Sequence, residues 1–301
     1  MMKIFRLVIV LLCMTAVQQV NAALRVFACE PEWAALTKEL GGGLVDVYAA
    51  TTALQDPHQI QTRPSLIARL RTANLLVCTG ADLEIGWLPV LLRQAGNPDV
   101  QPGQSGYFPA ADQVGKLEVP VQVDRAMGDV HPYGNPHIQL DPRRILTIAA
   151  ALSERLGEID TANRDDYANR FADFKQRWQD AILRWERQAV PLRGVRIVTD
   201  HQAWIYLFEW LGIEEVGTLE PKPGIAPSAG HLAQLKAELQ ARPARMVVRA
   251  AYRDARASQW LSKQTDIPAV VLPFTVGGTD GATDLFTFYD DTIERLLRAL
   301  R

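Results

Sequence analysis

Three histidines stand at comparable places in the sequence, each in a polar segment just before a predicted helix. His58 lies in QDPHQIQTRPS, His137 in GNPHIQLDP and His201 in VTDHQAW. His58 and His201 also follow predicted strands, one in each half of the chain, and ligand sites of parallel sheets lie beyond the carboxyl ends of strands. Imidazoles from separate loops that meet in one cleft are typical ligands of a late first-row metal ion. The pattern therefore predicts a metal site.

A carboxylate is the expected fourth ligand. Asp280 follows the predicted strand Ala269–Leu272 in TVGGTDGATDLF, where glycines let the backbone turn the side chain towards the cleft. Asp284 competes with it, although its position also suits the N-cap of the last predicted helix. His131, six residues before His137, is either an accessory ligand, a residue on the access path or a solvated loop histidine.

The expected set of three imidazoles and one carboxylate favours binding over catalysis. Four protein ligands complete a tetrahedral shell, whereas hydrolytic zinc sites keep one position open for water. The sequence contains no HExxH, GxSxG or P-loop motif. The ligand types suit Zn²⁺, because manganese favours more oxygen ligands.

Strand and helix signals alternate on both sides of one long predicted helix. Residues 23–95 and 195–300 each alternate short apolar strands with helices, which predicts parallel sheets. Residues 160–187 carry apolar side chains three or four apart, which predicts a helix about 40 Å long. We expect an α/β fold of two Rossmann-like lobes, residues 23–157 and 191–301, joined by a rigid helix over 158–190. The metal site is then expected in the cleft between the lobes.

Composition and charge narrow the classes of partner. The 32 basic and 34 acidic residues give a formal net charge of −2, which argues against nucleic acid. Five histidines and three cysteines in 301 residues exclude a large metal cluster and a disulfide-dense scaffold.

The N-terminus has the pattern of a secretory signal peptide. Lys3 and Arg6 precede an apolar run over residues 7–17, which is too short to span a bilayer. Small residues before Ala22 predict cleavage after about that position. We therefore expect an exported protein, in the periplasm.

Two cysteines remain after residue 22, and each ends an apolar run that is expected to be a strand. Cys29 ends LRVFAC and Cys78 ends NLLVC. In an oxidising compartment such cysteines either form a disulfide, if the strands are neighbours, or remain two buried thiols.

At these histidine segments the sequence resembles the zinc/manganese solute-binding proteins of ABC transporters, the cluster A-I or ZnuA/TroA-like family, over nearly the whole mature chain. DPHQIQTRPS and NPHIQLDP are similar to the first and second ligand segments. TDHQAWIYLFEWLG is similar to the third, where zinc-type members carry His and manganese-type members often carry Glu. The chain looks closest to the AztC-like branch, which uses three His and one Asp, although TVGGTDGATDLF departs from the common pattern.

The resemblance implies capture of Zn²⁺ in the periplasm and delivery to the membrane permease of an ABC importer. It carries ligand roles to His58, His137 and His201, and the AztC-like branch carries one to Asp280. It implies a binding protein and not an enzyme, which we expect to be a monomer, and it leaves open whether a periplasmic metallochaperone loads the site. Because a long helix resists hinging, we expect small loop or lobe motions on binding.

Three other functions compete with this interpretation. A manganese or iron carrier of the same family is one, and His201 argues against it. A secreted zinc metallohydrolase is another, which requires an open metal position and a general base. A surface adhesin, a role described for some relatives, is the third.

Overall fold

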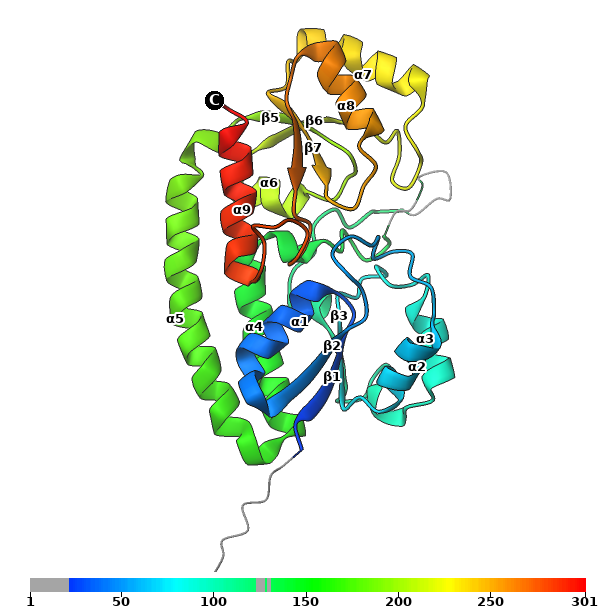
Figure 1. Ribbon diagram of the computed structural model, residues 1–301, viewed down its shortest axis with the longest axis vertical. Helices are drawn as coiled ribbons and strands as arrows, with labels where there is room; N and C mark the ends of the chain where they lie inside the picture. Colours follow the sequence, from blue (N-terminus) through cyan, green and yellow to red (C-terminus); the bar gives the residue numbers. More distant parts are fainter. Residues whose placement is uncertain (1–21, 123–127, 129–130) are drawn as a thin grey trace, which may run out of the picture.

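The computed structural model describes residues 22–122, 128 and 131–301. The predicted signal peptide falls on residues 1–21, outside the described residues, apart from Ala22. In Figure 1 the chain forms two α/β units, one above the other, with a long helix along one side. Within the described part of the chain, no helix is both long enough and apolar enough to cross a membrane.

The first lobe is built on a four-stranded parallel sheet in the order β2-β1-β3-β4. The central strand β1 pairs with both β2 and β3, and Val26 lies opposite Val47 on one side and Leu75 on the other. The strands are β1 (Leu24–Ala28), β2 (Val45–Ala49), β3 (Leu75–Cys78) and β4 (Tyr107–Pro109). The helices are α1 (Pro31–Gly41), α2 (Pro64–Arg71) and α3 (Leu88–Ala95).

The second lobe repeats the same strand order, β6-β5-β7-β8, with all pairs parallel. Its strands are β5 (Arg196–Thr199), β6 (Glu214–Thr218), β7 (Met246–Ala250) and β8 (Ala269–Leu272). Its helices are α6 (Ile205–Leu211), α7 (Ala229–Ala241), α8 (Arg256–Thr265) and α9 (Leu285–Arg298). The two parallel sheets confirm the expected α/β fold.

The long helix α5 (Arg164–Gln188) follows α4 (Pro142–Ile159) and packs against helices of both lobes. It contacts α4 and α1 along the first lobe and α9 at the second (Figure 1). Its buried face consists of residues three to seven apart: Tyr167, Phe174, Trp178, Ala181 and Trp185. A 3₁₀ turn (Thr161–Asn163) precedes α5, so the regular helix starts four residues later than expected.

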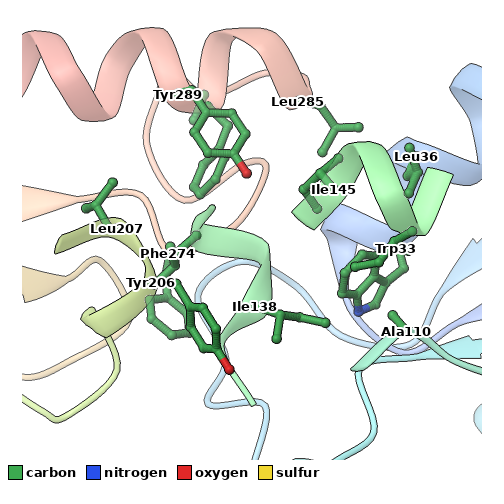
Figure 2. Packing of buried hydrophobic residues seen from close by; sticks show 14 of the residues in the cluster. Trp33, Leu36, Ala110, Ile138, Ile145, Tyr206, Leu207, Phe274, Leu285 and Tyr289 are labelled. Atoms are coloured by element: carbon green, nitrogen blue, oxygen red, sulfur yellow. The ribbon is translucent and has the colours of Figure 1, made fainter. Parts of the chain in front are cut away.

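One hydrophobic core runs through both lobes. Figure 2 shows side chains of α1, α4, α6 and α9 gathered around Ile138 and Phe274. Trp33 and Leu36 come from α1, while Leu285 and Tyr289 come from α9. Full burial of each large apolar side chain stabilises the fold by about 1.5–3 kcal/mol. The lobes therefore share a packed interface that opposes wide opening.

Cys29 and Cys78 form a disulfide. Cys29 directly follows β1, and Cys78 is the last residue of the neighbouring strand β3. Their Cα atoms are 4.8 Å apart. Both side chains are buried. The structure thus decides between the two alternatives that the sequence left open.

The helix α8 was not among the elements expected from the sequence. Its sequence RASQWLSKQT buries only Ser258 and Leu261. Its three apolar residues, Ala257, Trp260 and Leu261, follow the helical spacing i, i+3, i+4 but span little more than one turn, which is a weak signal for an amphipathic helix. Other short 3₁₀ turns among the described residues are Gly42–Leu44, Pro98–Val100, Ala110–Gln113, Ile138–Leu140 and Val190–Leu192.

Candidate metal centre

Three imidazoles meet where the two lobes face each other. His58, His137 and His201 each offer a ligand nitrogen, and these nitrogens all lie within 4.8 Å of one another. Their ring centroids are 5.5–6.1 Å apart. His58 follows β2 and His201 follows β5, so the carboxyl ends of two parallel sheets supply two of the three side chains. The structure therefore brings together the three histidines that the sequence indicated.

Two of these histidines are positioned by the same kind of backbone turn. In Asp56-Pro57-His58 the Asp56 carboxylate accepts the backbone N–H of His58 at 3.1 Å. In Asn135-Pro136-His137 the side-chain amide oxygen of Asn135 accepts the backbone N–H of His137 at the same distance. Such Asx turns reverse the chain without a long loop, and the proline fixes the intervening φ angle. Each imidazole is thus presented on a short, rigid turn.

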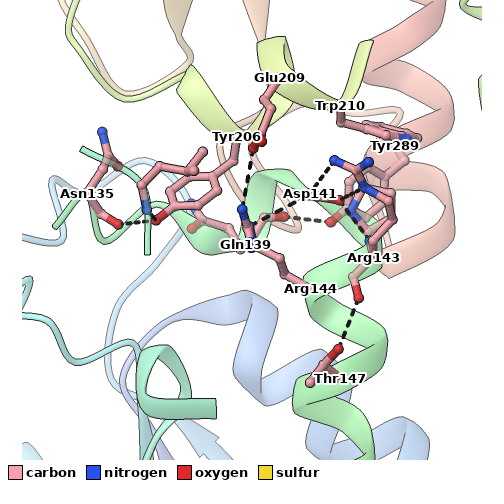
Figure 3. A network of polar contacts seen from close by, with 12 residues as sticks. Asn135, Gln139, Asp141, Arg143, Arg144, Thr147, Tyr206, Glu209, Trp210 and Tyr289 are labelled. Atoms are coloured by element: carbon pink, nitrogen blue, oxygen red, sulfur yellow. Dashed lines mark hydrogen bonds and ion pairs between the residues drawn. The ribbon is translucent and has the colours of Figure 1, made fainter. Parts of the chain in front are cut away.

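The segment that carries His137 is tied to helices of the second lobe (Figure 3). Tyr206 on α6 donates its hydroxyl to the carbonyl of Asn135 at 2.6 Å. Tyr289 on α9 donates to the carbonyl of Gln139, also at 2.6 Å. These two bonds flank His137, which is 1% exposed. The histidine is therefore fixed between the lobes.

Carboxylates hold the outer nitrogen of the other two imidazoles. Nδ1 of His58 donates to Asp56 at 2.8 Å, and Nδ1 of His201 donates to Glu220 at 2.7 Å. A carboxylate on Nδ1 leaves the Nε2 lone pair free and raises its basicity, which is the usual outer arrangement of metal-binding histidines.

Arg253, which follows β7, connects these carboxylates. Its guanidinium lies 3.8 Å from Asp56 of the first lobe and 3.7 Å from Asp200 of the second. It also forms an ion pair with Glu220. Asp200 is itself fixed, since it accepts the backbone N–H of Ala250 at 3.0 Å. One cation therefore links the carboxylates behind two imidazoles across the lobe interface.

The surroundings favour the neutral form of two of the imidazoles, His137 and His201. Burial lowers the pKa of His137 well below its usual value, and the neighbouring His58 and His201 add to this effect. Burial, with the Arg253 charge, also lowers the pKa of His201. Burial alone would raise the pKa of Asp56, but the contacts with His58 and the charge of Arg253 together outweigh this and lower the pKa. A neutral imidazole has a free lone pair, which is the form that binds a metal cation.

One ring nitrogen of His137 lacks a hydrogen-bond partner among the described residues. This atom, Nδ1, is buried. A buried polar atom left in this state costs about 1–3 kcal/mol. The ring of Phe274 covers one side of the imidazole at 5.1 Å between centroids. Donor type and burial at this point fit a bound metal ion.

His131 lies beside the three imidazoles and is not a solvated loop residue. Its ring centroid is 5.3 Å from that of His58 and 6.4 Å from that of His137. Burial and the nearby His58 and His201 lower its pKa to about 4. It falls outside the group whose ligand atoms lie within 4.8 Å. This position is compatible with both of the roles predicted from the sequence, an accessory ligand and an access-path residue.

The structure does not bring Asp280 into the imidazole group. Asp280 is exposed, and the loop around it packs along α9, where Thr279 donates its hydroxyl to Asp291. The expected turn of this carboxylate towards the cleft is therefore not seen. Asp284 caps α9, accepting the backbone N–H of Thr287 at 2.8 Å in a capping box. Neither carboxylate is in the group formed by His58, His137 and His201.

Sequence reasoning missed the residues behind the imidazoles, namely Asp56, Glu220 and Arg253. Asp56 could have been found from the local sequence Asp56-Pro57-His58, because an acidic side chain two residues before a proposed ligand can reach the imidazole of that ligand. Glu220 and Arg253 had only a weaker signal, since both follow strands of the second lobe and thus share the edge at which His201 lies.

The chain matches the family described as "Zinc-uptake complex component A periplasmic" over residues 26–300. It is 21% identical over 245 residues to a manganese ABC transporter substrate-binding lipoprotein of Streptococcus pneumoniae, PsaA, covering 80% of this chain and 76% of that protein. It is 26% identical over 198 residues to the high-affinity zinc uptake system protein ZnuA of Yersinia pestis, covering 61% of each chain.

Solved structures share the fold. The crystal structure of a ZnuA superposes with a TM-score of 0.78 at 21% identity and covers 93% of this chain and 100% of that one. The solute-binding protein FpvC of Pseudomonas aeruginosa, in complex with Mn²⁺, gives a TM-score of 0.75 at 18% identity, covering 93% of this chain and 99% of that one. The arrangement of two parallel-sheet lobes beside a long helix is thus common to these proteins.

Proposed function

Because the chain belongs to the family of periplasmic component A proteins of zinc-uptake complexes, whose members are metal-binding components of ABC transporters and not enzymes, we propose that its cargo is Zn²⁺. In this proposal the protein captures zinc in the periplasm and delivers it to a membrane permease. It acts as a monomer, and a periplasmic metallochaperone is a candidate for loading the site.

The observation that carries the proposal is the donor set. His58, His137 and His201 supply three imidazole nitrogens within 4.8 Å, and no carboxylate of the described residues belongs to that group. Nitrogen-rich tetrahedral sites suit zinc, whereas manganese favours carboxylate and other oxygen ligands in larger numbers. The resemblance to the AztC-like zinc-binding branch implies four ligands; His58, His137 and His201 lie in this group, and the fourth, Asp280, does not.

Manganese is the competing cargo, because relatives of both kinds are similar to this chain at low identity. The affinity order of divalent metals places zinc above manganese at nitrogen sites, so a nitrogen-rich site discriminates against manganese by affinity alone. The imidazole at His201 is the residue on which this discrimination depends most, since an oxygen ligand there would favour manganese.

The experiment that tests the cargo is a metal competition on the mature protein. The metal-free protein is dialysed against equal concentrations of zinc and manganese, and bound metal is measured by mass spectrometry. We expect about one equivalent of zinc and little manganese. The variant His201→Glu is expected to shift the bound fraction towards manganese. Equal binding of both metals by the unmodified protein would contradict a zinc carrier.

A further inference from the structure

A cavity of about 850 Å³ opens beside the imidazoles, between α7, α8 and the segment that follows β6. His58, His201 and Arg253 are among its lining residues. A metal ion with six waters occupies about 200 Å³, at about 30 Å³ for each water. The cavity is therefore several times larger than a hydrated ion requires, and lies in the size range of small-molecule sites, about 300–1,000 Å³.

The lining of this cavity also includes apolar side chains. They are Leu219, Ala226, Pro227, Leu232, Ala257 and Trp260. Trp260, on α8, is 36% exposed. A hydrated cation gains nothing from contact with such a wall, whereas an organic side chain does, at about 25 cal/mol per Å² buried.

The charges around the cavity select the class of occupant. Its lining contains four carboxylates, Asp56, Asp200, Glu220 and Asp254, and two guanidinium groups, Arg253 and Arg256, a difference of −2. One bound Zn²⁺ brings this sum to zero. A polyanionic chelator would restore a strong negative charge in a half-enclosed site, whereas an amino acid that binds through its amine and carboxylate adds at most one negative charge.

The metal position also has room for such a ligand. The described residues bring three nitrogen donors together, and Asp280, the expected fourth donor, is exposed on its loop. Zinc is commonly four-coordinate and sometimes five-coordinate. An amine and a carboxylate that enter from the cavity would complete a five-coordinate shell, because His58 and His201 line both the metal site and the cavity.

We propose that the protein binds zinc together with a small amino-acid-type chelator. The amine and carboxylate of this molecule bind the metal beside His58 and His201, and its side chain lies on the wall formed by Leu232, Ala257 and Trp260. The inference rests on the proposed function, because zinc anchors the chelator. It extends that function, since the cargo is then a zinc complex and not the bare ion.

Equilibrium dialysis with isotope-labelled L-histidine tests this inference. Zinc-loaded and zinc-free protein are dialysed separately, and retained histidine and zinc are both counted per protein. We expect one retained histidine on the zinc-loaded protein, with at least tenfold weaker retention on the zinc-free protein and on zinc-loaded protein offered labelled citrate instead. Zinc retained without histidine, or citrate retained in preference to histidine, overturns the inference.

Two variants locate the bound molecule. Ala257→Trp fills the cavity and Trp260→Ala removes part of its wall, whereas Leu183→Ala, at an exposed position on the distant helix α5, is the matched control. Both cavity variants are expected to keep zinc affinity within threefold and to weaken histidine retention, Ala257→Trp by at least tenfold. If Ala257→Trp does not fold, Trp260→Ala decides the question. Unchanged histidine retention in the folded cavity variants overturns the inference. If the unmodified protein does not bind zinc, the proposed function is overturned instead.

Discussion

Nδ1 of His201 lies 2.7 Å from a carboxylate oxygen of Glu220, and both side chains are buried. The same carboxylate pairs with Arg253, which also reaches Asp56 in the other lobe. Because Asp56 in turn holds His58, one connected set of charges orients two of the three imidazoles. The position of the proposed ligands thus depends on residues that do not touch the metal.

Removing the charge behind an imidazole is expected to weaken zinc binding. Glu220→Gln and Asp56→Asn keep the shape of each side chain but lose the carboxylate that makes the imidazole more basic. We expect each to raise the zinc dissociation constant by about 10-fold or more. Chelator competition at pH 7.5 measures this change. The matched control is Glu209→Gln, which removes a half-exposed carboxylate that pairs with Arg144. An equal loss of zinc affinity in this control would contradict a specific role of Asp56 and Glu220.

The exposed position of Asp280 predicts that its removal has little effect on zinc binding. Because this carboxylate is exposed on its loop, Asp280→Ala is expected to change zinc affinity by less than about threefold, as for ordinary surface substitutions. His131→Ala, beside His58, is expected to have an effect between that of Asp280→Ala and that of a ligand histidine. A large loss of affinity in Asp280→Ala would show that the loop moves to the metal on binding.

The failure to predict the position of Asp280 has a physical reason. Glycines on both sides of Asp280 allow many backbone paths, so sequence alone cannot say which way its side chain turns. The choice is made by tertiary contacts, such as the bond from Thr279 to Asp291 on α9. His58 and His137 were predictable because an Asx turn with a proline leaves the backbone few alternatives.

The fold was more predictable than the site for a related reason. Apolar runs separated by helices indicate parallel strands wherever they occur, and both sheets were expected from that alternation. The register that places Cys29 beside Cys78 is a tertiary property, so the sequence left their pairing open. Arg253 pairs with Asp56, which lies nearly 200 residues earlier in the sequence, and no local pattern indicates such an ion pair.

A buried carboxyl between the lobes predicts a pH dependence of stability. Glu32 on α1 accepts the hydroxyl of Thr275 in the second lobe. Burial raises its pKa to about 7, although that hydrogen bond opposes the shift. A carboxyl whose pKa is raised on folding stabilises the protein fully below its unfolded pKa, about 4.5, and loses this contribution as the pH rises through about 7.

The variant Glu32→Gln keeps the acceptor for Thr275 and removes the charge. We therefore expect it to be more stable than the unmodified protein at pH 8, by up to about 3 kcal/mol, with a difference that shrinks towards pH 5. Urea unfolding of the metal-free protein at several pH values measures this. Parallel stability curves for the two proteins would mean that Glu32 does not titrate in this range.

The shared core predicts a small conformational change on binding. Trp33 of α1, Ile145 of α4 and Tyr289 of α9 belong to one hydrophobic cluster (Figure 2), and α5 contacts both lobes. We expect zinc to change the radius of gyration by less than about 1 Å, measured by small-angle X-ray scattering. A compaction of several ångströms would indicate a hinge that this packing does not provide.

The most direct test is zinc affinity measured by chelator competition on the mature protein and on His58→Ala, His137→Ala and His201→Ala. Structural zinc sites bind with about 10–16 kcal/mol, or about 3 kcal/mol for each of four ligands. The account predicts one tight site and a loss of about 100-fold in each variant, with circular dichroism unchanged. Tight zinc binding that survives all three substitutions would contradict it.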